Sequence, residues 1–435
     1  MKRLIVCCDG TWNEPVDETN VIYGAAKAIL CTNGEGVSKS AVAPKVEQIV
    51  YYDTGVGTKE KRRTWKESLS TWEAAKDLLT ENDWVRMLLG GATGLGLSEN
   101  VQEAYRFLAK HYDPGDEIYV FGFSRGAYTV RSLCGLISCA GLLKIRSELE
   151  TYKLDPNTVD RLNEIYAYYR LDHHKRPSHP YHAVRETVAR PVPVRFCGVY
   201  DTVGSLGVPI APLAGLNTAH AFHDTSLCSC LAIGRQALAI DEERSPFEPT
   251  LWTGDLKSVE LFDGSRPYGD RRQDVIQAWF PGVHSNVGGG YRDYPALSRN
   301  ALRWLLREAE DAGLEIDEGL AGTVAYDARG RMAESVAGFW KVAMLTRLIR
   351  RTPRTIGSSL DPAVASKDRP VNEMLHWSAR ERMAASDAIG PAGGQGAWRP
   401  RSLFDANGQP HPHAAALPVC AAKPDGRRGS AGIAA

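Results

Sequence analysis

The chain has 435 residues, of which 43% are hydrophobic and 24% charged, so it can build a sizeable core like that of soluble globular proteins. Its 52 lysine and arginine residues balance its 52 aspartate and glutamate residues, which argues against nucleic-acid binding as a main role. Nine cysteines without disulfide-framework or zinc-site spacing favour a reducing compartment and no metal site. No apolar run reaches about 18 residues, so no membrane-spanning helix is expected, and no export signal is visible.

Five short apolar runs predict strands, and a turn or a glycine-rich loop follows each of them. The runs begin near residues 4, 49, 118, 193 and 275. Segments with helical spacing of apolar residues alternate with them, such as 101–108 before the third run and 130–137 after it. This alternation predicts an α/β fold with a doubly wound, mostly parallel sheet and helical insertions.

The third predicted strand runs into the sequence GFSRG at 122–126, and a predicted helix follows. A serine at such a sharp strand-to-helix turn has a strained backbone, and the glycines two residues to either side let the turn pack closely. G-x-S-x-G between a strand and a helix is the nucleophile elbow of α/β-hydrolases. Ser124 is therefore the candidate nucleophile.

Two residues that could activate this serine follow later predicted strands, Asp201 after the fourth and His284 after the fifth. An imidazole must take the serine proton, and a carboxylate must orient the imidazole. The carboxyl ends of parallel strands share one edge of the sheet, and the order Ser, Asp, His is that of α/β-hydrolases. The sequence leaves alternatives open, which are Asp241, Glu242, Glu243, Asp263 and Asp274 for the acid and His220 and His223 for the base.

An acyl-transfer site also needs backbone N–H donors for the oxyanion. One is expected from Arg125, the residue after the nucleophile. The second is expected from the loop after the first strand, at Gly10 and Thr11, because a glycine lets the backbone approach closely. This chemistry requires no cofactor and no metal.

The hydrolase domain is predicted to occupy residues 1–345, with 146–190 as a candidate lid or insertion. A helical extension is predicted for 346–384. The sequence from 385 to 435 is rich in alanine, glycine, proline and arginine and has almost no periodic apolar pattern, so we expect a low-complexity, disordered tail there.

Four ordered segments resemble those of one family: CDGTWN at 8–13, GFSRGA at 122–127, VYDTVG at 199–204 and WFPGVHSNVGGGY at 279–291. A fifth, AIDEER at 239–244 with Phe247 and Trp252, also resembles it. This is the uncharacterised α/β-hydrolase domain family that includes the phospholipase effectors of bacterial type VI secretion, and the resemblance covers about residues 1–295.

The resemblance implies a serine esterase that acts on lipid or phospholipid acyl esters, with Ser124 as nucleophile, Asp201 as acid and His284 as base. It implies peripheral membrane contact and, for an effector, an immunity-type or secretion partner and export by a system that reads no signal peptide. A housekeeping esterase would instead stay in the cytoplasm.

One position departs from the family, which commonly has an aspartate where this chain has Asn286. If that aspartate assists the histidine, Asp201 carries the orienting role alone here, or activity is reduced. Asn286 keeps open the alternative of a non-catalytic scaffold that serves as an interaction module. A phosphatase of the haloacid-dehalogenase type is disfavoured, because its nucleophilic aspartate would fall at Cys7.

Overall fold

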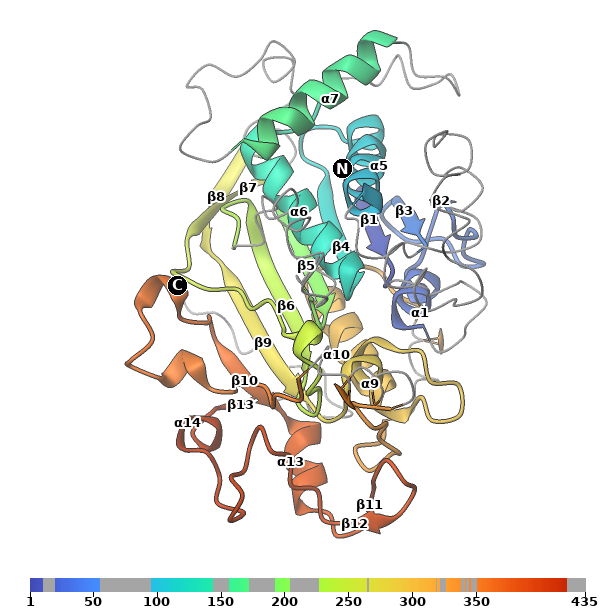
Figure 1. Cartoon of the computed structure of the whole chain (residues 1–435). Coiled ribbons are helices and arrows are strands. Elements are labelled where there is room, and N and C mark those ends of the chain that lie inside the picture. Colours follow the sequence, from blue (N-terminus) through green and yellow to red (C-terminus); the bar gives the residue numbers. More distant parts are fainter. Residues whose placement is uncertain are drawn as a thin grey trace, which may run out of the picture.

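A parallel sheet forms the centre of the computed structural model (Figure 1). The structure describes residues 1–10, 20–54, 95–143, 156–171, 192–203, 227–263, 266–317, 319–320, 326–337, 341, 344–345 and 350–420. The strands of the main sheet are β1 (Arg3–Cys8), β2 (Asn33–Glu35), β3 (Gln48–Asp53), β4 (Glu117–Phe123), β5 (Val194–Tyr200), β6 (Leu231–Ala239), β9 (Asp274–Phe280), β10 (Glu373–His376) and β13 (Val419–Cys420). Their order across the sheet is β13-β10-β9-β6-β5-β4-β1-β3-β2, and every neighbouring pair is parallel.

The order of the strands reverses beside β1. Strands β3 and β2 lie on one side of it, and the strands from β4 onward follow one another on the other side. In open parallel sheets such a reversal creates a crevice at the carboxyl ends of the strands, where ligands bind. Because Cys8 pairs with Gly122, the loop after β1 and the elbow after β4 leave the sheet at this crevice.

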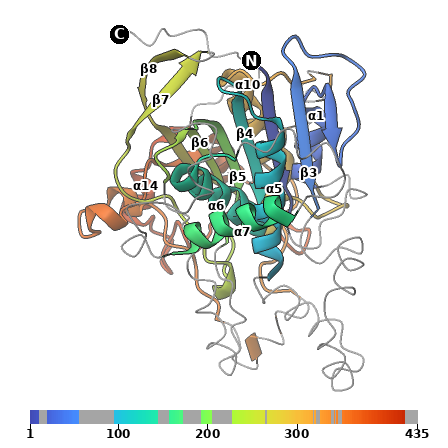
Figure 2. The same cartoon turned by 90° about the horizontal axis from the view of Figure 1, so that it is seen from above.

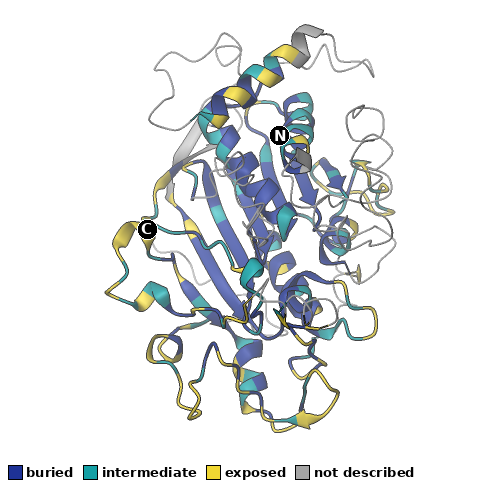
Figure 3. Cartoon of the chain, in the orientation of Figure 1, coloured by how far each residue is buried: buried dark blue, intermediate teal, exposed yellow. Residues whose placement is uncertain are grey.

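Helices cover both faces of the sheet (Figures 1 and 2). One face carries α5 (Leu95–His111), α6 (Arg125–Ala140) and α7 (Pro156–Arg170), and the other carries α1 (Val21–Ala28) and α10 (Ala296–Asp311). Each face of the sheet has its own hydrophobic core. In β1, Leu4 and Val6 pack into the core beneath α5, α6 and α7, and Ile5 packs into the core beneath α1 and α10. A strand covered on both faces is apolar at most positions, which explains apolar runs such as that of β1. Figure 3 shows the central strands buried. The predicted doubly wound α/β fold is confirmed.

Strand β6 lies between β5 and β9, although the sequence analysis predicted no strand there. Its sequence LAIGRQALA consists largely of residues with high helix propensity and has two polar residues at its centre. Arg235 Nε donates to Glu308 Oε2 of α10 at 2.6 Å. Gln236 Oε1 accepts a hydrogen bond from the Thr202 hydroxyl at 2.6 Å, and its Nε2 donates to Gln277 Oε1 at 3.1 Å. These partners are distant in sequence, so no local pattern reveals the strand.

The prediction of a disordered tail from residue 385 is wrong for 385–420, which packs against the main sheet (Figure 1, orange to red). Strand β13 pairs with β10, and β10 pairs with β9, so the predicted boundary at 345 does not separate this segment from the sheet. Its buried side chains include Trp398, Leu403 and Leu417. They lie on loops at irregular spacing, so the sequence shows no periodicity.

Two other predicted segments are described only in part. Within the predicted helical extension at 346–384, described from 350, the α-helix is α13 (Trp377–Ala384), and β10 precedes it. Within the candidate lid at 146–190, residues 156–171 are described, and all but the last of them form α7. Helix α7 packs against α6 through core residues such as Ile165. The rest of 146–190 and residues 421–435 lie outside the described residues. Strands β7 (Ser258–Asp263) and β8 (Arg266–Arg272) form a separate antiparallel sheet of two strands (Figure 1).

Replacing Trp398 with alanine is expected to lower the free energy of unfolding by about 3–5 kcal/mol, because it leaves a cavity in a packed core. Trp398 is 6% exposed, and its Nε1 donates to Asp241 Oδ1 at 2.9 Å. Urea unfolding followed by circular dichroism measures the effect. The control is Asn407→Ala on an exposed turn of the same segment, which should change stability by less than about 0.5 kcal/mol. Equal stability of the two variants would show that 385–420 does not share the cooperative core.

Candidate active site

Ser124 lies in a strained turn between β4 and α6, with φ of 54° and ψ of −118°. Among the described residues, Ser124, Asp201 and Asn372 are the non-glycine residues with positive φ. Such a conformation costs about 1–3 kcal/mol and persists where the surroundings enforce it. A Cβ at Gly126 would lie 2.2 Å from the Cys8 carbonyl oxygen, so the close approach of the turn to β1 requires glycine there. The turn therefore has the geometry of a nucleophile elbow.

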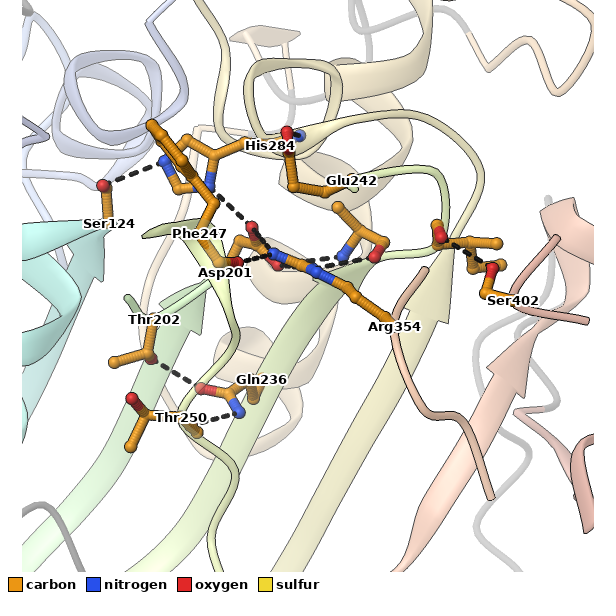
Figure 4. Close-up of polar contacts among 12 residues, drawn as sticks. Ser124, Asp201, Thr202, Gln236, Glu242, Phe247, Thr250, His284, Arg354 and Ser402 are labelled. Atoms are coloured by element: carbon orange, nitrogen blue, oxygen red, sulfur yellow. Dashed lines mark hydrogen bonds and ion pairs between the residues drawn. The ribbon is translucent and has the colours of Figure 1, made fainter. Parts of the chain in front are cut away.

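The imidazole of His284 connects Ser124 to Asp201 (Figure 4). Its Nε2 lies 2.9 Å from Ser124 Oγ, and its Nδ1 lies 2.6 Å from Asp201 Oδ2. Asp201 is completely buried, and His284 is 5% exposed. The structure thus brings together three side chains that follow three different strands, in the arrangement in which an imidazole can take a serine proton while a carboxylate orients it.

The backbone and the ring of His284 are both held in place. The residue begins the short helix α9 (His284–Gly288), four residues after β9 ends, and its N–H donates to Glu242 Oε2 at 3.2 Å. The ring packs against both Phe123 and Phe247, with centroid distances of 4.7 and 4.9 Å. These contacts fix the orientation of the imidazole and surround it with apolar surface.

Four hydrogen bonds hold the Asp201 carboxylate. Oδ1 accepts from the Ala239 N–H at 2.9 Å and from Arg354 Nη1 at 2.5 Å, while Oδ2 accepts from Arg354 Nη2 at 2.9 Å besides its bond with His284. Burial opposes ionisation of Asp201, but the charge of Arg354 and the hydrogen bonds from His284 and Arg354 hold the pKa of this carboxyl well below its usual range. Asp201 is therefore ionised at neutral pH.

Sequence reasoning missed Arg354. It lies 153 residues after Asp201, in a stretch where several arginines and a Pro-Arg-Thr sequence give no sign of a buried role. Its side chain is 3% exposed, and its guanidinium also donates to the carbonyl oxygens of Ala239 and Phe247, at 2.8 and 2.6 Å. A signal for it could come only from the fold, which brings the chain after 350 back to the end of β6.

The alternative acids have other partners within the described structure. Asp241 accepts from the Gly282 N–H and from Trp398, and burial raises the pKa of Asp241 to about 6. Glu242, Glu243 and Asp274 pair with Arg244, Arg351 and Arg235. The side chain of Asp263 and the whole of His220 and His223 lie outside the described residues. Among the described carboxylates, Asp201 contacts the His284 ring.

Asn286 acts on the backbone around His284. Its Oδ1 accepts from the N–H groups of Val283 at 3.2 Å and Ala333 at 2.9 Å, and the residue is 1% exposed. It therefore ties the turn before His284 to the segment at 333. An aspartate oxygen could accept the same two bonds, so the amide preserves this local support.

The structure describes two of the three residues that were predicted to donate to the oxyanion, Arg125 and Gly10. Arg125 is the first residue of α6, where backbone N–H groups point out of the helix end. A Cβ on Gly10 would lie 2.6 Å from the ring of Phe123, so Gly10 lies beside the residue before the nucleophile. Its N–H, however, donates to Asp9 Oδ1 at 2.7 Å. Thr11 lies outside the described residues.

The structure shows two further features of the described residues. None of their helices is long and apolar enough to cross a membrane. Nor do the described histidine, cysteine, aspartate and glutamate residues form a group of three or more that could hold a metal ion.

Comparisons of the chain with known proteins identify its family. Residues 2–308 match the family model described as type VI secretion system phospholipase effector, Tle1-like, catalytic domain. The chain belongs to this family. The matched residues contain the elbow, Asp201 and His284, so the family resemblance predicted from the motifs is confirmed, whereas Arg354 lies outside the match.

Individual relatives of this Tle1-like chain are distant. It is 28% identical over 267 residues to an uncharacterized protein of Saccharomyces cerevisiae, a match that covers 58% of this chain and 33% of that protein. A crystal structure of an uncharacterized protein from Pseudomonas aeruginosa is 16% identical, with a TM-score of 0.36 and coverage of 75% and 49% of the two chains. The Tle1 effector bound to the VgrG spike is 16% identical, with a TM-score of 0.32 and coverage of 67% and 51%. The chain spans about a third of the yeast relative and about half of each solved chain.

Proposed function

We propose that this chain hydrolyses acyl esters of lipids, phospholipids among them, through a serine nucleophile and an acyl-enzyme. The observation that carries the proposal is the continuous hydrogen-bonded chain from Ser124 Oγ through His284 to Asp201. Membership of a family of phospholipase effector catalytic domains supports the lipid ester as substrate class.

In the proposed mechanism, Ser124 Oγ attacks the ester carbonyl carbon while its proton passes to His284 Nε2. Asp201 stabilises the imidazolium through Nδ1, and backbone N–H groups, with Arg125 as one donor, stabilise the oxyanion. The tetrahedral intermediate expels the alcohol portion of the lipid, which takes the proton from Nε2. Water then attacks the acyl-enzyme with the same imidazole as base, and the fatty acid and free Ser124 are released.

The second oxyanion donor in this proposal comes from the loop after β1. Because the Gly10 N–H donates to Asp9 in the present structure, it would have to turn away from Asp9 to serve. Asp9 has other donors, since the Tyr52 hydroxyl donates to its Oδ2 at 2.7 Å and Asn20 Nδ2 also donates to Oδ2. The carboxylate would therefore keep hydrogen-bond partners after such a turn.

The proposal extends to the site of action, for which the same family membership is the support. An effector would leave the cell through type VI secretion without a signal peptide, would meet its lipid through peripheral membrane contact and would have a secretion partner and an immunity-type partner. These remain parts of the proposal. The rival function, a non-catalytic scaffold, is disfavoured by the hydrogen-bonded arrangement of Ser124, His284 and Asp201.

Labelling with a fluorophosphonate tests the function. We expect wild type to gain one adduct, located by mass spectrometry on Ser124, while Ser124→Ala gains none and the exposed-site control Ser366→Ala labels like wild type. Phospholipid vesicles should then release fatty acid and lysophospholipid. No labelling of folded wild type would refute the serine mechanism and favour the scaffold, and labelling without fatty-acid release would refute the lipid substrate.

A further inference from the structure

We infer that Arg354 is a positioning residue, which fixes the Asp201 carboxylate for His284 and extends the activity of the enzyme to lower pH. The inference rests on the proposed function, because it assumes that His284 is the general base. Arg354 comes from the segment after the matched catalytic domain, so the site is completed from outside that domain.

The contacts of Arg354 with Asp201 are more extensive than charge neutralisation requires. Two guanidinium nitrogens reach the two carboxylate oxygens separately, at 2.5 and 2.9 Å. The fork therefore resists rotation of the carboxylate, which a single donor would allow. Oδ2, which faces the imidazole, is thereby held from a second side.

Arg354 also joins the elements around the imidazole. Its Nη1 donates to the Ala239 carbonyl at the end of β6, and its Nη2 donates to the Phe247 carbonyl. The Phe247 ring packs on His284. The guanidinium thus connects Asp201 to a second residue that contacts the imidazole, so a change at 354 reaches the imidazole through both residues.

The charge of Arg354 acts on the protonated base. Asp201 stabilises the imidazolium, and a guanidinium bonded to the same carboxylate offsets part of this effect. The other charged groups near the histidine have their own partners: Glu242 Oε2 accepts from the His284 N–H and pairs with Arg244, and Asp241 accepts from the Gly282 N–H. Among the described residues, Tyr291 interacts with Glu242 and Arg244, and Ser124 Oγ contacts His284 Nε2. Loss of the guanidinium should therefore favour the inactive, protonated base.

The test is the pH profile of kcat/KM for a soluble short-chain ester, measured on the full chain. The acid limb of this profile is the pH range over which kcat/KM falls as the pH is lowered. Arg354→Gln removes the charge, so we expect the acid limb to move up by about one pH unit. Because the fork is lost as well, we expect kcat to fall about 10- to 100-fold with little change in KM. Arg354→Lys keeps the charge without the fork, so its acid limb should stay in place while kcat falls about tenfold. Misfolding alone would lower activity without moving the limb.

The matched control is Arg351→Gln, three residues away, which removes an arginine whose side chain is 44% exposed and pairs with Glu243. Arg351→Gln should keep the acid limb and the kcat of wild type. An Arg354→Gln variant that folds and keeps the wild-type limb would overturn the inference. Should Arg354→Gln fail to fold, Arg354→Lys decides, because a lysine variant with the kcat of wild type would overturn it.

Ser124→Ala, measured in the same assay, separates the two levels of the proposal. If wild type shows no turnover that Ser124→Ala abolishes, the proposed function fails. If wild type works through Ser124 and the Arg354 variants match it in kcat and acid limb, only the role of Arg354 fails.

Discussion

Replacing Ser124 or His284 with alanine is expected to lower kcat for an ester substrate by about 10⁴-fold or more, and replacing both should lower it no further. The reason is that Ser124 Oγ and His284 Nε2, 2.9 Å apart, act in the same proton transfer. Once one is lost, the other has nothing to contribute. Steady-state kinetics of the two single variants and the double variant, on one soluble ester, measure the effect.

Stability and a surface histidine provide the controls for this experiment. Ser124→Ala removes one hydroxyl, whereas His284→Ala removes a buried ring, so urea unfolding of all three variants is needed to show that the rate losses do not result from unfolding. His413 is exposed, and His413→Ala should keep the wild-type rate. Rate losses that multiply in the double variant would contradict a shared step, because independent contributions add in free energy.

The meeting of Ser124, Asp201 and His284 could be predicted because each of these residues follows a strand that the sequence displays. The strands before Ser124, Asp201 and His284 are buried on both faces, so each is mostly apolar and ends at a turn, although Arg195 and Gln277 interrupt the second and the third. Parallel strands then place their carboxyl ends at one edge without further information. The order of the three residues along the chain and the glycines of the elbow suggest the role that we propose for each residue.

Strand β6 and Arg354 could not be predicted, because tertiary contacts determine both. Arg235 in β6 is buried only because Glu308 and Asp274 neutralise it, and both lie tens of residues away in sequence. Arg354 is buried because the C-terminal segment joins the sheet through β10 and β13. A sequence pattern reports local periodicity, whereas the burial of a charge depends on where its partner lies in space.

Asp201→Asn is expected to lower kcat by about 10³- to 10⁴-fold. The amide would place an N–H group near His284 Nδ1 or lose that hydrogen bond. In the first case the imidazole carries its proton on Nε2, where it would donate to Ser124 instead of accepting from it. The rate loss should persist at every pH, because it results from the tautomer. Steady-state kinetics across the pH range check this.

The same substitution should also lower the free energy of unfolding by about 3–5 kcal/mol at pH 7, because it leaves the buried Arg354 without a counter-charge. The pKa of Asp201 is lowered on folding, so its stabilising contribution is complete above the usual carboxyl value of 3.8 and is lost as pH falls below it. The difference in stability between wild type and Asp201→Asn should therefore narrow below about pH 4. Urea unfolding at pH 7 and at lower pH values measures it.

Adding Arg354→Gln to Asp201→Asn separates stability from catalysis. The double variant has no buried charge at this position, so we expect its free energy of unfolding to exceed that of Asp201→Asn, since removal of both partners of an ion pair costs less than removal of one. Its kcat should stay as low as that of Asp201→Asn, because the oriented carboxylate is still missing. If the second substitution lowered stability further, the two side chains would not be coupled as the two hydrogen bonds between them imply. If it restored kcat, Asp201 would not be the group that orients His284.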